Sequence, residues 1–180
     1  MFYVNRFLGI LALVAIAVTV AAIVALVTRR VPPWARDVAL PLATAIALVT
    51  TLGSLYYSEV AGFPPCTLCW YQRIAIYPQV IVIGVAAWRR DTEVWRTTLP
   101  LAVVGGVLSL WHVVIERNPA LAGPCDPANP CTIKWVEELG FLTIPMMALV
   151  AQVALVALTL LVRSRPDRPV GAGTTERSIA

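Results

Sequence analysis

Long apolar runs separated by short polar segments are the dominant pattern along this chain. Five runs, at residues 7–28, 38–58, 69–88, 97–115 and 141–162, consist mainly of apolar side chains. Crossing a hydrocarbon core about 30 Å thick takes about 20 such residues, because an α-helix rises about 1.5 Å per residue. We therefore predict five membrane-spanning helices joined by short connectors.

Composition supports this prediction. Of the 180 residues, 59% are hydrophobic and 13% are charged, against about 25% charged residues in an average soluble domain. The first run could instead be a cleaved secretory signal, but it is longer than the roughly 7 to 15 apolar residues of such a signal. Arg29 and Arg30 also stand where the small residues of a cleavage site are expected, so we expect the first helix to be retained.

The basic residues predict how the helices are oriented. A net charge of +4 could suggest a nucleic-acid partner, but the Lys and Arg residues flank apolar runs and form no aromatic-interleaved patch. Cytoplasmic connectors are enriched in Lys and Arg. If connector 29–37 is cytoplasmic, ten of the fourteen basic residues share that side: Arg29, Arg30, Arg36, Arg89, Arg90, Arg96, Arg163, Arg165, Arg168 and Arg177. The N-terminus is then outside, the C-terminus is cytoplasmic, and connectors 59–68 and 116–140 are extracytoplasmic.

The cysteines lie in those two extracytoplasmic connectors or, in the case of Cys69, at the first residue of the run that follows, and they form the pairs Cys66/Cys69 and Cys125/Cys131. Two structural disulfides are one interpretation, because an oxidising compartment permits them. A C-x-x-C pair, however, closes so small a ring that it contributes little loop-closure stabilisation, and its usual role is redox chemistry. The first pair therefore favours a redox function.

The residues around Cys66 predict a reactive site. Pro64 and Pro65 are tolerated at a helix start but not inside a helix, so we expect the third helix to begin at or just after Cys66. The N-terminus of a helix favours an anion, and Arg73 lies four residues after Cys69, on the same helix face. We expect these features to lower the pKa of Cys69. A snorkelling anchor is the other interpretation of Arg73.

The second pair lies in the segment Gly123-Pro-Cys-Asp-Pro-Ala-Asn-Pro-Cys131, whose prolines and glycine predict an exposed loop. After it, residues 132–139 alternate apolar and charged positions around Trp135, and we predict a short interfacial helix there. A zinc site is a competing use of four cysteines, but the five residues between Cys125 and Cys131 exceed the usual two to four. We therefore expect no metal.

The run Cys66-Thr-Leu-Cys69-Trp-Tyr-Gln-Arg73 closely resembles the C-x-L-C-x-Y-x-R signature of the disulfide bond formation protein B (DsbB) family, particularly its BdbC-like branch. Trp111-His112 late in the fourth run, the Cys125/Cys131 loop and residues 135–145 also match, and the resemblance spans residues 40–161. It implies an all-α, polytopic membrane protein with a four-helix bundle core, to which this chain adds an N-terminal transmembrane helix.

The apolar runs, the resemblance and the composition of the C-terminal segment together predict a division of the chain. Residues 1–37 would hold the additional helix and its cytoplasmic connector, residues 38–162 the four-helix redox core with two extracytoplasmic cysteine loops, and residues 163–180 a disordered cytoplasmic tail. The protein would lie in the bacterial inner (cytoplasmic) membrane. A thioredoxin-like thiol oxidase, of the DsbA or BdbD type, would be its extracytoplasmic partner.

The resemblance implies roles for the four cysteines in a thiol:quinone oxidoreductase that drives protein disulfide formation. Cys125 would form the mixed disulfide with the partner, and Cys131 would pass the disulfide to Cys66. Cys69 would lie beside a membrane quinone, either ubiquinone or menaquinone. The relay from DsbA through DsbB to quinone is what keeps the bacterial periplasm oxidising.

The resemblance further implies that Arg73 contacts the quinone, as would His112, the only histidine. A lone histidine near a helix end is as often a packed residue as a ligand, so this role stays open. The chain also departs from the family pattern. It has an additional helix and a short spacing between the loop cysteines, and it carries Gln72 where some relatives have an acidic residue.

Two rival functions remain. One is a quinone reductase like vitamin K epoxide reductase, although that family places its C-x-x-C pair late in the chain and after the loop pair. The other is a non-enzymatic membrane subunit that two disulfides hold together.

Overall fold

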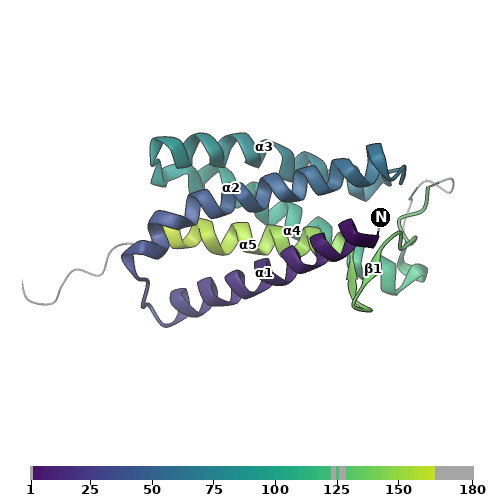
Figure 1. Ribbon diagram of the computed structural model, residues 1–180, viewed down its shortest axis with the longest axis horizontal. Coiled ribbons are helices and arrows are strands. Elements are labelled where there is room, and N and C mark those ends of the chain that lie inside the picture. Colours follow the sequence, from purple (N-terminus) through teal and green to yellow (C-terminus); the bar gives the residue numbers. More distant parts are fainter. Residues whose placement is uncertain (1, 123–124, 126–128, 165–180) are drawn as a thin grey trace, which may run out of the picture.

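The computed structural model describes residues 2–122, 125 and 129–164, and five long helices make up most of this part (Figure 1). They are α1 (Phe2–Val27), α2 (Pro33–Leu55), α3 (Thr67–Arg89), α4 (Trp95–Arg117) and α5 (Ile144–Arg163). All five are long and apolar enough to cross a membrane. The prediction of an all-α, multi-pass membrane protein is therefore confirmed.

Four of the helices form a closed bundle. Helix α2 packs against α3, α3 against α4, α4 against α5, and α5 against α2, whereas α1 packs on the outside of α5. The most apolar 18-residue window of α5 is 50% buried, against 17% for that of α1, so α5 is the central helix. This is the predicted four-helix core with an additional N-terminal helix.

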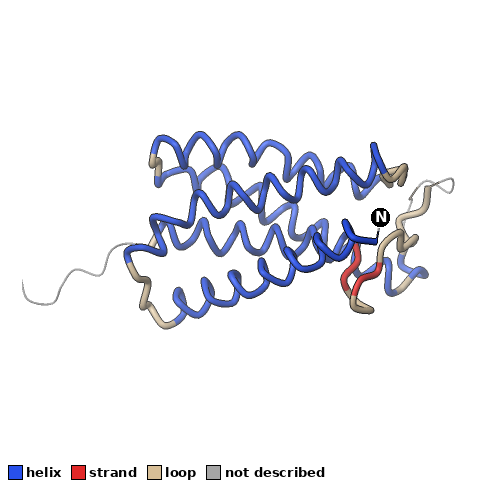
Figure 2. Tube along the Cα trace, in the orientation of Figure 1, coloured by secondary structure: helices blue, strands red, loops and turns tan. Residues whose placement is uncertain are grey.

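The shorter elements lie between these helices. They are the π-helix η1 (Tyr56–Val60), the 3-10 helices η2 (Thr92–Val94) and η3 (Pro119–Leu121), and the strands β1 (Glu137–Glu138) and β2 (Leu142–Thr143). The strands pair antiparallel, with Glu138 opposite Leu142. Figure 2 shows them at the end of the bundle where α1 begins. Both cysteine-bearing connectors lie at this end, because α2 and α4 end here and α3 and α5 begin here.

The predicted interfacial helix at residues 132–139 is wrong. This segment consists of turn and irregular loop before β1 and a turn after it, and Leu139 and Gly140 have φ angles of 56° and 75°, which a right-handed helix excludes. The Trp135 ring stacks on Phe63 with centroids 5.0 Å apart, and Phe63 stacks in turn on Tyr57. Strand pairing and aromatic stacking outweigh the local amphipathic pattern.

The bundle interior contains a polar contact far from either end. Gln79 of α3 donates from Nε2 to Oε1 of Gln152 on α5 at 3.2 Å, and both side chains are buried. Gly105 of α4 lies against Gln152, since a Cβ at that position would collide with the amide of this side chain. The close approach of α4 to α5 therefore depends on glycine, which has no side chain, at residue 105.

The inferred orientation and the division at residues 37 and 162 stay predictions. Of the tail predicted to be disordered, residues 163–180, Arg163 is the last residue of α5 and Ser164 is its C-cap, and the rest, from residue 165 on, lies outside the described residues.

Candidate functional site

The first cysteine pair lies at the N-terminus of α3, as predicted. Cys66 is the N-cap residue with an extended backbone, and α3 begins at Thr67, directly after the two prolines and the cap. The backbone N–H of Cys69 donates to Sγ of Cys66 at 3.3 Å. A sulfur in this position receives an otherwise unpaired helix N–H and the positive end of the helix dipole, both of which favour a thiolate.

The two sulfurs of this pair are unbonded but close. Sγ of Cys66 and Sγ of Cys69 are 2.8 Å apart. Cys66 is buried, whereas Cys69 is half-buried and lines the larger cavity described below. The pair can therefore interconvert between dithiol and disulfide with little movement, and its second sulfur faces the cavity.

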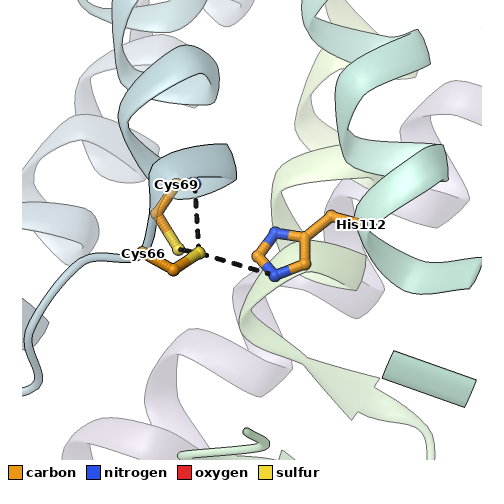
Figure 3. A group of neighbouring side chains, drawn as sticks. All are labelled: Cys66, Cys69 and His112. Carbon is orange, nitrogen blue, oxygen red and sulfur yellow. Dashed lines mark hydrogen bonds between the residues drawn. The ribbon is translucent and has the colours of Figure 1, made fainter. Parts of the chain in front are cut away.

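His112 of α4 lies on the other side of Cys66, as Figure 3 shows. Its Nε2 is 3.8 Å from Sγ of Cys66 and 3.0 Å from the backbone oxygen of Cys131. Its Nδ1 is 3.1 Å from Nε2 of Gln72. With Gln72 donating to Nδ1, the histidine proton lies on Nε2, which points toward Cys66 and Cys131.

The contacts of Cys66 explain a strong shift in its acidity. The neighbouring Cys69 thiol, His112 and the Cys69 backbone N–H stabilise the thiolate and lower the pKa of Cys66 from 9.0 to about 4, although burial opposes them. We expected the anion-favouring contacts at Cys69. In the structure these contacts are made to Cys66. As the N-cap residue, Cys66 accepts the free backbone N–H, and Cys69, the third residue of the helix, donates it.

The second pair forms a disulfide between Cys125 and Cys131. Cys131 is only 1% exposed, whereas Cys125 is half-buried. Cys66, Cys131 and Ile115 form one buried cluster, and Cys69 and Cys125 pack against it. The fold thus brings together two pairs that are more than 50 residues apart in the sequence.

Arg73 is held inside the bundle by α2. It is 8% exposed, and its Nε and Nη2 donate to Oγ and the backbone oxygen of Ser54, each at 3.1 Å. Its guanidinium carbon lies 5.2 Å from the centre of the Trp70 ring. These contacts fix the cation in place, and the interpretation of Arg73 as a snorkelling anchor does not describe so buried a side chain.

Cys69 and Arg73 line the same cavity, which has a volume of about 270 Å³. The polar residues Gln72, Ser54 and Tyr57 also line it, near the end of the bundle that carries the cysteines. Apolar side chains of α1, α2, α3 and α5 make up most of the rest, including Leu11, Val18, Ile46, Ile76 and Met147. The cavity therefore has a polar end beside a redox sulfur and an apolar body.

His112 lines a second, smaller cavity of about 30 Å³ together with Glu116 and three of the cysteines, Cys66, Cys69 and Cys131. It is absent from the described lining of the larger cavity. Its predicted contact with a quinone stays a prediction, and its observed position is between the cysteine pairs.

The sequence did not single out Ser54 or Glu116. Ser54 was hidden in a long apolar run, and only its polarity there could have drawn attention. Glu116, 7% exposed, accepts a hydrogen bond from Oγ1 of Thr143 at 2.7 Å and ties α4 to β2. An acidic residue at the end of an apolar run is a weak signal for such a buried contact.

Cys66, Cys69 and His112 offer three potential metal-ligand atoms within 4.8 Å of one another. A structural zinc site takes four ligands, and the other two cysteines are bonded to each other. That the chain binds no metal stays a prediction, which metal analysis of the purified protein tests.

Comparison with known proteins identifies the family. The family model for disulfide bond formation protein DsbB matches residues 36–162. The disulfide bond formation protein C of Bacillus subtilis (strain 168) is 40% identical over 120 residues, which are 66% of this chain and 87% of that protein. A probable disulfide formation protein C 1 of Bacillus anthracis is 39% identical over 129 residues, 71% of this chain and 93% of that protein.

A probable disulfide formation protein of Metapseudomonas resinovorans is 34% identical over 123 residues, 67% of this chain and 85% of that protein. No solved structure matches. Helix α1 ends at Val27, before the first residue of the family match. The matched residues contain both cysteine pairs, Arg73 and His112, and on this evidence the chain belongs to the DsbB family of disulfide bond formation proteins, which are multi-pass membrane oxidoreductases.

Proposed function

We propose that this protein reoxidises an extracytoplasmic thioredoxin-like thiol oxidase, of the DsbA or BdbD type, and passes the electrons to a membrane quinone. The observation that carries the proposal is the position of Cys69, which lies 2.8 Å from Cys66 on one side and lines the cavity with Arg73 on the other. One sulfur pair thus connects the loop disulfide to an apolar cavity.

The unequal burial of the loop cysteines supports a direction for the first exchange. A thiolate of the partner attacks Cys125, which is the more accessible of the two, and Cys131 leaves as a thiolate. The second thiol of the partner then releases Cys125, so the partner gains a disulfide and the loop pair becomes a dithiol. Exchange through such mixed disulfides is the general route.

The second exchange transfers the disulfide within the chain. The thiolate of Cys131, buried in one cluster with Cys66, attacks the sulfur of Cys66 in the oxidised Cys66/Cys69 pair, and Cys69 leaves. Cys125 then attacks Cys131, which restores the loop disulfide and frees Cys66 as a thiolate. His112, with Nε2 toward both cysteines, stabilises the negative charge on Cys66.

The larger cavity fits a quinone. Its polar end offers the guanidinium of Arg73 to a carbonyl oxygen, and its apolar body suits a hydrocarbon tail. A bound quinone would supply the oxidant, accepting two electrons and two protons as the Cys66/Cys69 dithiol closes to a disulfide. Arg73 stabilises negative charge at this end of the cavity, since it is fixed by Ser54 and shielded from water.

Quinone absorbance during turnover by the purified protein tests the proposal, with either a reduced thioredoxin-like partner or a small dithiol as reductant. We expect Cys66→Ser and Cys69→Ser to abolish turnover with both reductants. Cys125→Ser and Cys131→Ser should abolish it with the protein partner only, because a small dithiol can reduce the inner pair directly.

Retained turnover in Cys69→Ser would contradict the relay. If the thiol state of all four cysteines in membranes does not change with the quinone supply, the protein is instead a non-enzymatic subunit held together by two disulfides.

A further inference from the structure

We propose that α1, which lies outside the family match, forms one wall of the quinone cavity and selects quinones by their hydrocarbon tail. This inference rests on the proposed function and adds to it the part of the ligand that the additional helix recognises.

The first observation is that one face of α1 lines the cavity. The residues of this face recur at helical spacing: Leu8, Leu11, Ala12, Ala15 and Val18, together with Val14. They face α2 across the cavity, whose opposite side includes Leu42, Ala45, Ile46 and Val49. Without α1, this region would be an open, lipid-facing groove on the four-helix core.

The second observation is the length of the cavity. Its lining on α2 extends from Leu42 to Ser54, which corresponds to about 18 Å at 1.5 Å per residue. On α1 it extends from Leu8 to Val18, or about 15 Å. A quinone ring at Arg73 and Cys69 occupies only one end of such a space, so the remainder fits an extended hydrocarbon chain.

The third observation is that α1 is fixed where the ring would bind. Oδ1 of Asn5 accepts a hydrogen bond from the Tyr57 hydroxyl at 3.2 Å, and a Cβ at Gly53 would lie only 3.4 Å from both methyl carbons of Leu8. Gly9 lies close to β1, since a Cβ there would be 3.7 Å from Cβ of Glu138. These contacts hold α1 against the core at the cysteine end.

Small side chains leave the space open along α1. Ala12 is buried and Ala15 is half-buried, and both line the cavity. Ala17, on the same helix, is exposed and is not part of the lining. A large side chain at residue 15 should therefore fill the apolar body of the cavity, whereas the same side chain at residue 17 should point into lipid.

The test measures quinone binding to the purified full-length protein by quenching of tryptophan fluorescence, so that the result does not depend on turnover. The probes are a menaquinone with an isoprenoid tail and menadione, which has the same ring without the tail. A ubiquinone with a tail and its tail-less ring form a second pair. The variants are Ala15→Phe and the matched control Ala17→Phe.

We expect Ala15→Phe to raise the Kd of the tailed quinone by about tenfold or more, because buried hydrocarbon contacts are lost. The Kd of the tail-less quinone should change less than about twofold, and Ala17→Phe should leave both values unchanged. Equal Kd values for the tailed quinone in both variants would overturn the inference. So would equal weakening of both probes, or wild-type affinity that is independent of the tail, as expected if a lipid chain fills the cavity.

The two proposals fail in different ways. If the wild-type protein binds neither probe, the proposed function itself is wrong. If Ala15→Phe does not accumulate in the membrane, Ala15→Leu takes its place with the same expected direction, and unchanged binding of the tailed quinone by this variant overturns the inference.

Discussion

Arg73 is a buried cation whose position is fixed from two sides, by Ser54 on α2 and by the Trp70 ring on its own helix. A charge inside a membrane protein is costly and usually functional. Here the guanidinium lies at the polar end of the cavity, so it can stabilise negative charge on a bound ligand without moving.

Replacing this side chain tests its role. We expect Arg73→Gln to lower kcat/KM for the quinone by on the order of a hundredfold, as for loss of a fixed donor to developing negative charge. Turnover rates at several quinone concentrations give kcat/KM for each variant. Arg96→Gln is the control, since Arg96 is an exposed residue in a surface ion pair at the opposite end of the bundle. Equal activity of both variants would contradict the assignment.

Cys66 should give the reduced protein an unusual pH dependence. Since its pKa is lowered from 9.0 to about 4, we expect the ultraviolet absorbance of a thiolate to persist down to about pH 4. Cys66→Ser should remove this transition, and His112→Ala should shift it upward. If the first thiolate absorbance appears only near pH 9, the ordinary thiol pKa, the contacts described for Cys66 do not stabilise its thiolate.

The same shift affects stability. The folded pKa of Cys66 lies below the unfolded value, so deprotonation stabilises the reduced fold. The contribution is complete above about pH 9 and is lost as the pH falls toward 4. Thermal unfolding of the reduced protein should therefore occur at lower temperature at pH 5 than at pH 8, with a smaller difference in Cys66→Ser.

At the scale of the elements, the contact between α4 and α5 depends on Gly105. We expect Gly105→Ala to destabilise the protein by about 1 to 3 kcal/mol, because its Cβ would displace the Gln152 amide and disturb the bond to Gln79. A Cβ at Gly106 meets Cβ of Gln152 at an ordinary 3.7 Å. Gly106→Ala is therefore the matched control, and thermal unfolding in detergent compares the two.

The helices were predictable because apolar run length alone identifies a membrane span, and the prolines before Cys66 located the start of α3. Segment 132–139 was not predictable in this way. Its local pattern favours a helix, but its conformation is set by the left-handed pair Leu139 and Gly140 and by stacking on Phe63. Such long-range contacts leave little trace in a local pattern.

The candidate site was predictable in part for a similar reason. The spacing of Cys66, Cys69 and Arg73 follows from helical geometry, and in the structure Cys69 and Arg73 line one cavity. Which cysteine receives the free N–H, and which cavity His112 lines, depend on the packing of α4 against α3. The lining contributed by α1 depends likewise on how that helix docks, which its nearly uniform apolar sequence does not specify.

For the whole molecule, the distribution of Arg residues predicts that the C-terminus is cytoplasmic. A fluorescent protein fused to the C-terminus of the full chain should then be bright, whereas alkaline phosphatase fused at the same point should be inactive, because it folds only after export. The reciprocal result would reverse the orientation and place both cysteine connectors in the cytoplasm.

Both cysteine pairs and the polar end of the larger cavity lie at the same end of the bundle. In the proposed reaction, thiol protons are released and quinol protons are taken up at one membrane face, and the electrons travel only between neighbouring groups at that face. Turnover therefore moves no net charge across the bilayer. A collapsed membrane potential should leave the rate of disulfide formation unchanged at a constant supply of oxidised quinone. Under the proposed function, the oxidised state of exported proteins would follow the oxidation state of the quinone pool and not the membrane potential itself.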